Sequence, residues 1–455
     1  PSVIADMVLC FAALLLAAST LTTRYATLPR PVPELPLVLV GAAIFSLVMA
    51  LAYAAVGLYR PKDMPALSKL ARTGFALLVG GYITSLSLST VADRGYIEQL
   101  LPAALAYLTI GLVFVRGGFS LMRRVTSLPR VLIVGTGSEA LALASALQNS
   151  GVNPREVVGL YPTRSDAGTS AQDVLANSPK IFSNTDAIHD VAARHGVQEI
   201  IVAVREQRGG GVPMDELLAC RIRGILVVDL AGYSEKTRRE VPIDSLKGSW
   251  LVYGRGFVQG AGRRAVKRSF DIVGSLLLLA VLSPIMVAAA LAVRLDSSGS
   301  VIYRQARVGL GGRIFTCFKF RSIRSDAEKD GIARWASKGD SRVTRVGAFL
   351  RKTRIDELPQ LVSVLLGEMS LVGPRPERPS FVEQLKDEIP FYEIRHTVKP
   401  GITGWAQVRY HYGASLEDAK RKHQFDLYYV KNNSLWLDLL VLVETVSVMA
   451  FWEGQ

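Results

Sequence analysis

The stretch SLLLLAVLSPIMVAAALAV, residues Ser275 to Val293, lies in a chain whose formal net charge is +14. The uncharged run around it extends from Ile272 to Val293, close to the ~20 residues that cross a bilayer as a helix. The centre of the run holds Ser283 and Pro284. A membrane-crossing helix can contain a proline kink, but the same pair could also turn the chain back to the side from which it came.

Charges on both flanks of the run favour the second arrangement. A crossing helix would place one basic cluster on each face of the membrane, against the tendency of such clusters to stay on one face. The hydroxyl of Ser283 can bond a carbonyl that Pro284 leaves free. We therefore predict a re-entrant helix over residues 269–295, hinged at Ser283 and Pro284 on the cytoplasmic face, with a kinked crossing helix as the alternative. The flanking residues are Arg263, Arg264, Lys267 and Arg268 before the run, and Arg294, Arg304, Arg307 and Arg313 after it.

The composition indicates a protein with embedded and soluble parts. Of the 455 residues 49% are hydrophobic, too many for a wholly soluble chain, and 20% are charged, too many for a wholly embedded one. Cys10, Cys220 and Cys317 are far apart, without disulfide or metal-ligand spacing, so we infer a reducing compartment for the soluble parts. The positive charge suggests anionic partners, which could be lipid headgroups, nucleotide phosphates or nucleic acid.

Four uncharged stretches predict a four-helix transmembrane bundle in a first domain, residues 1–125. They cover residues 7–23, 35–59, 73–92 and 99–115. Most basic residues follow the second and the fourth stretch, so the positive-inside rule places both ends of the bundle in the cytoplasm. A cleaved signal peptide is a weaker interpretation of the first stretch, because no basic leader precedes it. The stretches lack internal ionisable residues, which favours a plain membrane anchor.

From Arg130 the pattern changes to strand, glycine turn and helix. RVLIV is followed by GTGSEA and an Ala/Leu-rich helix, and further strands are expected at 156–161, 199–204 and 224–230. This order predicts a Rossmann-like α/β module over residues 126–255. Its turn, with Gly135 and Gly137, could bind a pyrophosphate. Because the second strand ends without an acidic residue for a ribose, a structural or regulatory module is favoured over a working nucleotide site.

The third domain, residues 262–455, combines short turns and many basic residues, which surround the acidic pair Asp356 and Glu357. The basic field is expected to hold a carboxylate ionised, as a nucleophile or a metal ligand must be. From spacing alone an ordinary salt-bridged pair is the more common explanation, and a basic cluster is usually a solvated face. The residues by themselves predict a cytoplasmic site at the membrane for phosphorylated ligands. The basic neighbours of the pair are Arg342, Arg345, Arg351, Lys352 and Arg354.

These residues resemble the bacterial sugar transferase family, the monotopic phosphoglycosyl transferases that begin glycoconjugate assembly on polyprenyl phosphate. The resemblance covers residues 267–452, and the preceding parts are similar to the larger members, the polyprenyl-phosphate hexose-1-phosphate transferases. The form GWAQVRYHYGAS resembles exopolysaccharide-associated members. The motifs are, in order, KRSFD from Lys267, Ser283-Pro284, KFRSI from Lys319, DELPQL from Asp356, GPRPE from Gly373 and KPGITGWAQV from Lys399.

The resemblance implies a fold, a reaction and a set of site residues. The third domain would be an α/β phosphoglycosyl transferase domain in the bacterial inner membrane, in contact with the lipid bilayer and with its soluble parts in the cytoplasm. Asp356 would attack a UDP-sugar and release UMP, and polyprenyl (undecaprenyl) phosphate would then take the sugar phosphate in a ping-pong mechanism. Glu357 would support this by orienting groups and by acid–base or metal contacts, and Mg²⁺ would be the cofactor, with Asp356 as a ligand. Substrate- or phosphate-binding roles are implied for Lys319, Arg321, Arg351, Arg375, Glu377 and Lys399.

Several alternatives remain open on this evidence. The sugar is expected to be glucose or galactose, with an N-acetylhexosamine as the alternative, for an exopolysaccharide or O-antigen type glycan. A function other than catalysis, that of an inactive nucleotide-sensing scaffold for polysaccharide export, is the alternative, although the DEL and PRPE motifs argue against it. A nucleic-acid binder would not need four membrane helices, so no nucleic acid is expected. The α/β module could mediate a homodimer.

The last apolar stretch, residues 434–452, contains Asp438 and Glu444. A membrane-crossing helix would bury both acids at a cost of a few kcal/mol each. We therefore predict an interfacial helix, or one packed against the re-entrant helix, with Trp436 and Trp452 at the headgroup boundary. A core helix of the soluble domain is the alternative.

Overall fold

The computed structural model combines helices with short sheets. Its contacts separate the chain into two compact units, residues 1–200 with 210–227 and residues 201–209 with 228–455. The three-domain division expected from the sequence stays a prediction. The structure describes residues 3–25, 35–59, 66–90, 93–125, 128–148, 155–163, 180–183, 185–204, 212–243, 246, 256–257, 259–323, 342–410, 413 and 415–450.

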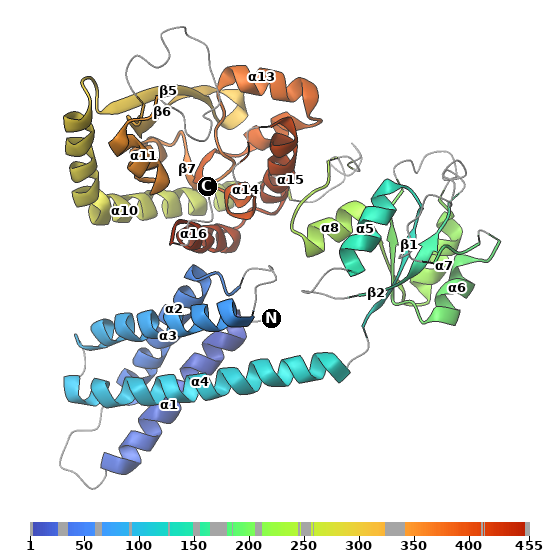
Figure 1. The fold of residues 1–455 in the computed structure, drawn as a ribbon, viewed down its shortest axis with the longest axis horizontal. Coiled ribbons are helices and arrows are strands. Elements are labelled where there is room, and N and C mark those ends of the chain that lie inside the picture. The colour runs from blue at the N-terminus through green and yellow to red at the C-terminus, as the bar shows by residue number, and fades with distance from the viewer. Residues whose placement is uncertain are drawn as a thin grey trace. The chain divides into compact units, whose positions relative to one another are not determined.

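Four long helices occupy the first part of the chain (Figure 1): α1 (Val3–Tyr25), α2 (Leu35–Ala55), α3 (Ala66–Leu88) and α4 (Arg94–Val125). Helix α1 packs against α2 and α4, and α3 packs against the same two helices. All four predicted helices form. Helices α3 and α4 are longer than their uncharged stretches, because a helix is held by backbone hydrogen bonds and can continue through charged residues at its ends.

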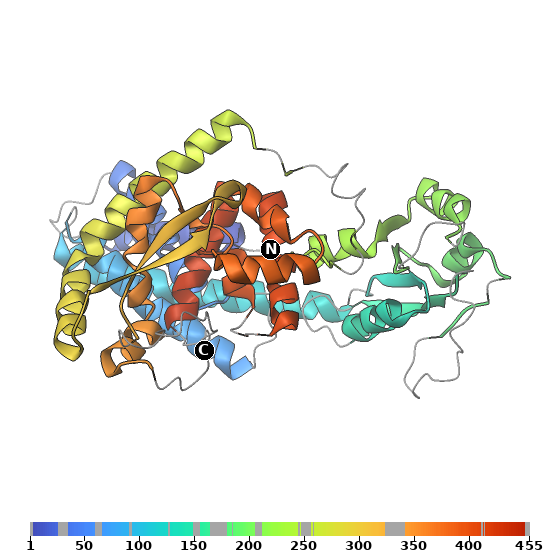
Figure 2. The ribbon, with the colours of Figure 1, turned by 90° about the horizontal axis from the view of Figure 1, so that it is seen from above.

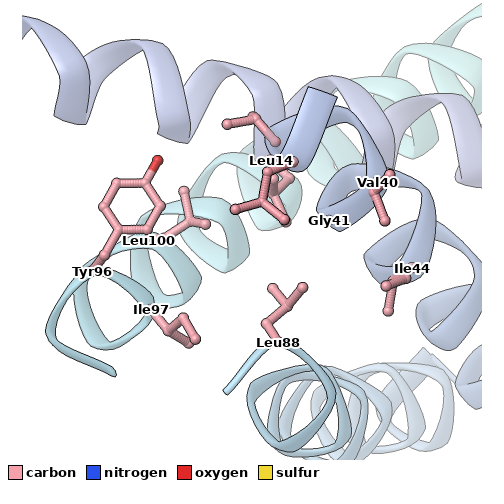
Figure 3. A pocket seen from close by; sticks show the side chains of 10 residues that line it. Leu14, Val40, Gly41, Ile44, Leu88, Tyr96, Ile97 and Leu100 are labelled. Atoms are coloured by element: carbon pink, nitrogen blue, oxygen red, sulfur yellow. The ribbon is translucent and has the colours of Figure 1, made fainter. Parts of the chain in front are cut away.

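By length and composition, four of the described helices could cross a membrane: Val3–Thr23, Leu35–Ala55, Arg94–Gly118 and Ala261–Asp296. Helix α3, predicted to cross, is not among them, and its sequence mixes apolar residues with Lys69, Arg72 and several Gly, Ser and Thr residues. The chain thus has the apolar helices of a membrane protein. A pocket within the first helices is lined by apolar side chains, among them Leu14, Ile44 and Leu100 (Figure 3).

A four-stranded sheet follows these helices in the chain. The strands β1 (Arg130–Val134), β2 (Glu156–Tyr161), β3 (Glu199–Val202) and β4 (Leu226–Asp229) lie in the order β2-β1-β3-β4, and β1 and β2 run parallel. The expected strands are therefore confirmed. After β1, Gly135 has a φ of 123°, a conformation that favours glycine. The helices of this region are α5 (Ser138–Gln148), α6 (Ile188–His195), α7 (Met214–Ile222) and α8 (Leu230–Thr237).

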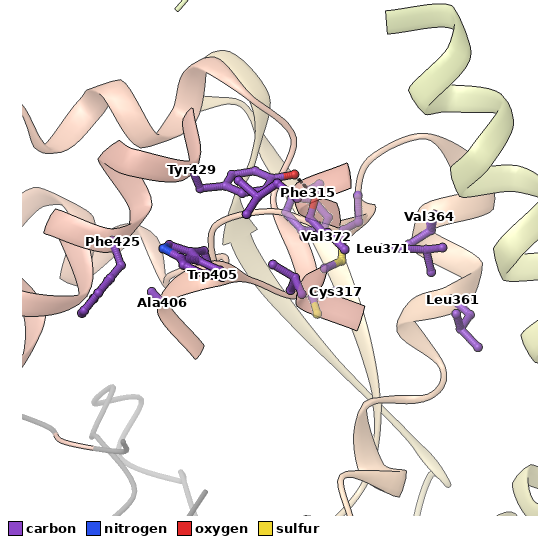
Figure 4. Packing of buried hydrophobic residues seen from close by; sticks show 13 residues of the cluster. Phe315, Cys317, Leu361, Val364, Leu371, Val372, Trp405, Ala406, Phe425 and Tyr429 are labelled. Atoms are coloured by element: carbon purple, nitrogen blue, oxygen red, sulfur yellow. Dashed lines mark hydrogen bonds between the residues drawn. The ribbon is translucent and has the colours of Figure 1, made fainter. Parts of the chain in front are cut away.

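The rest of the second unit is built around a hairpin and a small parallel pair of strands. Strand β5 (Ile302–Val308) pairs antiparallel with β6 (Ile314–Phe320), and β7 (Ser370–Val372) pairs parallel with β8 (Gly401–Thr403). Figure 4 shows Phe315 and Cys317 of the hairpin packed with Trp405 and Tyr429 in one buried cluster. The helices around them are α10 (Ala261–Asp296), α11 (Arg345–Lys352), α12 (Gln360–Leu366), α13 (Pro379–Glu388), α14 (Trp405–Arg409), α15 (Leu416–Asn432) and α16 (Leu435–Ala450), with short 3-10 turns η3 (Leu310–Gly312), η4 (Ile355–Glu357) and η5 (Tyr392–Thr397).

Helix α10 contains the apolar run and bends within its length, as the two views in Figures 1 and 2 show. Pro284 has no N–H for the carbonyl of Ala280, and the Ser283 hydroxyl donates to that carbonyl at 3.0 Å instead. Apolar side chains in both halves are largely exposed, including Leu277 (64%) and Leu291 (60%). A helix that exposes this much apolar surface is suited to lipid rather than to water.

Both ends of α10 are attached to the same compact unit. At the first end, Lys267 Nζ donates to Asp438 Oδ2 at 2.8 Å. At the other end, Arg321 Nη2 donates to Ser297 O at 2.7 Å, and Val293 is buried in a cluster with Phe320. A straight helix of 36 residues would be about 54 Å long. The bend therefore allows the second half to return to the unit that holds the first.

Helix α16 packs within the second unit through its acidic residues. Asp438 is fully buried and bonds Lys267 of α10, and Glu444 bonds Arg409 at 2.7 Å. These contacts are those of a core helix, the alternative to the predicted interfacial helix, and they join α16 to the first turns of α10 through Lys267. Trp436 is exposed at 65%. Trp452 lies outside the described residues.

Candidate active site

The acidic pair lies on a single 3-10 turn between α11 and α12. Helix α11 ends at Lys352, and Arg354 then adopts a left-handed backbone with a φ of 59°, which turns the chain into η4. Pro359 caps the start of α12. Asp356 and Glu357 are buried on this turn, each 6% exposed. Two adjacent buried carboxylates need compensating charge, because burial disfavours their ionised forms.

Three basic side chains surround Glu357 and supply that charge. Lys319 Nζ, from β6, donates to Glu357 Oε1 at 2.9 Å, and Arg375 Nη2 donates to the same oxygen at 2.8 Å. Arg354 Nη1 lies 3.9 Å from Glu357 Oε2. The side chains of Arg375 and Arg354 keep 32% and 35% of their surface exposed. Their guanidinium groups are therefore also accessible to an anionic ligand.

The two carboxyl groups differ in acidity despite being neighbours. Burial alone would raise the pKa of Glu357, but Arg375, Lys319 and Arg354 outweigh it and hold that pKa well below its usual value. For Asp356, burial and the negative charge of Glu357 raise the pKa to about 6, against the opposing effect of Lys319 and Arg375. Both carboxyl groups are thus ionised at neutral pH, but by a smaller margin for Asp356, because Glu357 takes the closest cations.

The GPRPE motif forms the loop after β7, and its backbone is closely packed. Gly373 N donates to Thr403 O at 2.9 Å, and Gly401 N donates to Pro374 O at 2.9 Å. A side chain at Gly373 would collide with the backbone of Lys399 and Gly401. The loop thereby brings Arg375 to Glu357, which lies 18 residues before it in the sequence. The structure unites three of the predicted site motifs, KFRSI, DELPQL and GPRPE.

Other predicted site residues lie elsewhere in the second unit. Arg321 is bonded to Ser297 at the end of α10 rather than to the acidic pair. Glu377 forms an ion pair with Arg307 at 3.7 Å. Lys399 lies near the first turns of α10, and burial together with Arg268 lowers its pKa. Arg351 is in the last turn of α11, and the described contacts of the acidic pair involve Arg354 in its place.

The remaining predicted sites belong to other parts of the chain. Ser283 and Pro284 lie inside α10, where the predicted hydrogen bond to a free carbonyl is present. Gly135 and Gly137 lie in the turn between β1 and α5. A side chain at Gly137 would meet no atom within 4 Å, so this turn is open.

Sequence reasoning missed two residues that support the site. Arg354 was counted only as a neighbour of the pair, although its place three residues before Glu357 was a signal for an ion pair. Arg395 is buried, donates to the backbone carbonyl of Arg375 at 2.9 Å and carries no motif signal of its own. Contacts of that kind depend on tertiary packing, and they could not be read from spacing.

The arrangement is suited to nucleophilic chemistry on a phosphate group. Asp356 offers a buried carboxylate that is ionised around neutral pH, and Arg375 and Arg354 offer partly exposed cations beside it. A carboxylate can attack an anionic phosphorus centre only where positive charge offsets the repulsion. Within the described residues, no group of three or more His, Cys, Asp or Glu side chains could hold a metal ion alone.

Comparison with known proteins agrees with this chemistry. A family model described as "Bacterial sugar transferase" matches residues 262–452. A UDP-N-acetylgalactosamine-undecaprenyl-phosphate N-acetylgalactosaminephosphotransferase of Aeromonas hydrophila is 44% identical over 233 residues, 51% of this chain and 54% of the relative. The chain thus spans about half the length of that protein.

Two further relatives match more of the chain. A UDP-glucose:undecaprenyl-phosphate glucose-1-phosphate transferase of Escherichia coli (strain K12) is 33% identical over 392 residues, 83% of this chain and 82% of the relative. An undecaprenyl-phosphate galactose phosphotransferase of Salmonella typhimurium is 32% identical over 347 residues, 71% of this chain and 69% of the relative. From the site and these similarities together, the chain belongs to the bacterial sugar transferase family.

Proposed function

We propose that this protein transfers a sugar 1-phosphate from a UDP-sugar to polyprenyl phosphate and releases UMP. The observation that carries the proposal is the buried Asp356, whose neighbour Glu357 is bonded to Lys319 and Arg375. The names of the relatives support the same class of reaction, since each specifies undecaprenyl phosphate as a substrate.

The proposed reaction has two steps that use the site in turn. A carboxylate oxygen of Asp356 attacks the phosphorus that bears the sugar, forming an acyl phosphate while the bond to the UMP oxygen breaks and UMP leaves with that electron pair. An oxygen of polyprenyl phosphate then attacks the same phosphorus, which breaks the bond to Asp356 and restores the carboxylate. Covalent catalysis lets a water-soluble and a lipid substrate react without being bound together.

In this proposal Glu357 does not attack the phosphorus but holds the side chains of Lys319 and Arg375 in place. Because its pKa stays low, it remains ionised and fixes Lys319 and Arg375 beside Asp356. Arg375 and Arg354 then bind the phosphate oxygens and offset the charge that develops as UMP departs. The roles implied by resemblance for Arg321, Arg351, Glu377 and Lys399 stay predictions.

We propose Mg²⁺ as the cofactor, with Asp356 as its protein ligand. Glu357 is engaged by Lys319 and Arg375, so Asp356 is the carboxylate of the pair that remains for a metal. Mg²⁺ is commonly held by one or two carboxylates together with substrate phosphates, so a single carboxylate fits this ion. When bound, Mg²⁺ would neutralise charge on the diphosphate.

We propose that α10 is a re-entrant helix and that the site faces the cytoplasm at an inner membrane. The attachment of both ends of α10 to one unit supports this, because a helix that crossed the bilayer would have its ends on opposite faces. Basic residues on both flanks of α10 support the same arrangement. The lipid bilayer would present the phosphate of the polyprenyl substrate at headgroup level.

We also propose that residues 126–255 form a Rossmann-like module. The strand order β2-β1-β3-β4 and the parallel pairing of β1 with β2 support this. In the same proposal, the turn at Gly135 and Gly137 is a candidate nucleotide site, and the module is a candidate contact for a homodimer. Titration with NAD and CoA, and the mass of the detergent-purified protein, test the two points separately.

UMP release tests the proposed reaction. The wild-type protein is expected to release UMP from UDP-glucose or UDP-galactose when polyprenyl phosphate and Mg²⁺ are present, and about one UMP per enzyme without polyprenyl phosphate. UDP-N-acetylgalactosamine completes the panel, and preference for it would reassign the sugar. Asp356→Asn is the matched control, since it keeps the size of the side chain but removes the nucleophile. Full activity of Asp356→Asn would refute the assignment of Asp356.

A further inference from the structure

Three basic side chains bond backbone carbonyls between the end of β7 and the loop that carries Arg375. Among the described contacts, none of the three bonds Asp356 or Glu357. Lys267 and Arg307 bond carbonyls within three residues of Arg375, and Arg395 bonds the carbonyl of Arg375 itself. The pairs are Lys267 Nζ with Val372 O (3.3 Å), Arg307 Nη1 with Pro376 O (2.8 Å) and Arg395 Nη2 with Arg375 O (2.9 Å).

Arg395 is fixed from several sides. It lies on η5, is 5% exposed, and its Nη2 also donates to Asp426 Oδ2 of α15 at 2.8 Å. The guanidinium lies 4.9 Å from the ring centre of Tyr392 and bonds the hydroxyl of that residue. The bonds to Asp426 and to the Arg375 carbonyl both come from one nitrogen, Nη2, while Nη1 bonds the Tyr392 hydroxyl, so three partners together hold the planar guanidinium in one orientation.

A buried ion pair of this kind is a poor source of stability. The cost of removing both charges from water usually equals or exceeds their attraction, and well-packed apolar residues would often stabilise the fold as much. Asp426 is 2% exposed, and both partners lie inside the domain. What the pair adds is a directed hydrogen bond to one carbonyl of the Arg375 loop, in a fixed position.

We propose that the Arg395–Asp426 ion pair is a positioning pair for Arg375, which holds the backbone of Arg375 so that its guanidinium reaches Glu357 and the phosphates of the bound UDP-sugar. This inference rests on the proposed function for the identity of the ligand. The described bonds of Arg395 go to Tyr392, Asp426 and the Arg375 carbonyl, and none goes to the acidic pair, so in this proposal the positioning pair acts through Arg375.

Arg395→Lys tests the pair with the least change in charge. Lysine can still pair with Asp426, but it has no second nitrogen to keep the Nη1 bond to Tyr392, so its bond to the Arg375 carbonyl is less well directed. We expect kcat/KM for UDP-glucose to fall about tenfold, which is about 1.4 kcal/mol of transition-state stabilisation. The thermal unfolding midpoint should stay within a few degrees of the wild-type value.

A double-mutant cycle separates positioning from a general structural role. In an Arg375→Ala background the route through Arg375 is absent, so adding Arg395→Lys is expected to lower kcat/KM less than about twofold. Equal losses in the two backgrounds would show that Arg395 does not act through Arg375 and would overturn the proposal. So would full activity of the single variant Arg395→Lys.

The chain offers a matched control and a second variant. The buried pair of Arg409 and Glu444 has the same chemistry, with a 2.7 Å bond and the guanidinium 4.1 Å from the ring centre of Trp405. Arg409→Lys is expected to lose activity equally with and without Arg375, in contrast to Arg395→Lys. If Arg395→Lys does not fold, Asp426→Asn is used in the same cycle, where additivity would again overturn the proposal.

Binding of UDP, measured by calorimetry, keeps the two proposals distinguishable. Arg375→Ala and Arg395→Lys are both expected to weaken UDP binding, and the double variant no more than Arg375→Ala. If the wild type turned over no UDP-sugar but showed this pattern, the proposed function would fail while the positioning role stood. Additive losses in UDP affinity would remove the positioning role alone.

Discussion

Asp356 and Glu357 show how two adjacent carboxyl groups come to differ. Glu357 receives the bonds from Lys319 and Arg375, whereas Asp356 lies beside the resulting negative charge in a buried position. The low pKa of Glu357 and the raised pKa of Asp356 are therefore two results of one arrangement. A residue that must be a nucleophile at neutral pH can tolerate a pKa near 6, because it is still mostly ionised there.

This difference predicts an acid limb in the pH profile. In the proposed mechanism Asp356 attacks only when deprotonated, and its pKa is raised to about 6, so kcat/KM should be constant above pH ~7 and fall about tenfold per unit well below pH 6. Glu357→Gln removes the neighbouring negative charge and should move the limb to lower pH, even as it reduces the rate. A limb unchanged by Glu357→Gln, measured from initial rates of UMP release, would contradict the coupling.

The left-handed backbone of Arg354 leads us to expect two variants at this position that differ in stability but not in activity. Its φ of 59° costs a side chain about 1 kcal/mol that glycine does not incur. Arg354→Gly should thus unfold in denaturant with a free energy about 1 kcal/mol above that of Arg354→Ala. Both variants lose the guanidinium near Glu357, so their kcat/KM values should fall alike. Equal stability of the two variants would show that the backbone strain is relieved elsewhere.

At the scale of elements, the bend of α10 joins the membrane helix to the site. The Ser283 hydroxyl satisfies the carbonyl that Pro284 leaves without a donor, so the bend does not expose an unpaired polar group to lipid. The second half then reaches β6 and α11, where Val293 packs with Phe320 and Leu350. Because β6 also carries Lys319, the position of α10 and that of the site are linked through one strand.

The bend of α10 allows two predictions, one for cysteine labelling on either side of the helix and one for a substitution of Pro284. Arg264→Cys and Arg304→Cys, both at exposed positions, should react with an impermeant maleimide from the same face, while the three native cysteines are buried. Pro284→Leu restores the backbone donor and should straighten α10, which would impair glycolipid formation far more than Ser283→Ala. Labelling from opposite faces would contradict the re-entrant arrangement.

At the scale of the whole molecule, apolar helices and a basic catalytic unit occur in one chain. The net charge of +14 suits the proposed substrates, a nucleotide-diphosphate sugar and a lipid phosphate at an anionic surface. Among the described residues, four helices are apolar enough to cross a membrane, and one of them, α10, belongs to the family-matched region 262–452. An apolar helix suited to a membrane therefore lies within the family-matched region itself.

Local patterns in the sequence determined the elements and the residues that carry the chemistry. Continuous apolar runs predicted α1, α2, α4 and α10, and RVLIV with its glycine turn predicted β1 and α5. These signals are local, because helix and strand formation depend on the side chains within a few turns or residues. The motifs around Asp356 and Arg375 likewise carried the resemblance to the family, which is confirmed, while the roles of the individual residues stay predictions.

Only the tertiary structure decided which cations serve which acid. Lys319, Glu357 and Arg375 meet although β6, η4 and the loop after β7 are far apart in the chain. Arg321 and Arg351 had equal claims by sequence, yet Arg321 bonds Ser297 and Arg354 lies at Glu357 instead of Arg351. Electrostatic interactions fall steeply with distance and depend on burial, and both are set by packing rather than by composition. The sequence determined which charged groups the chain contains, and the fold decided that Lys319 and Arg375 bond Glu357 and leave Asp356 with the raised pKa.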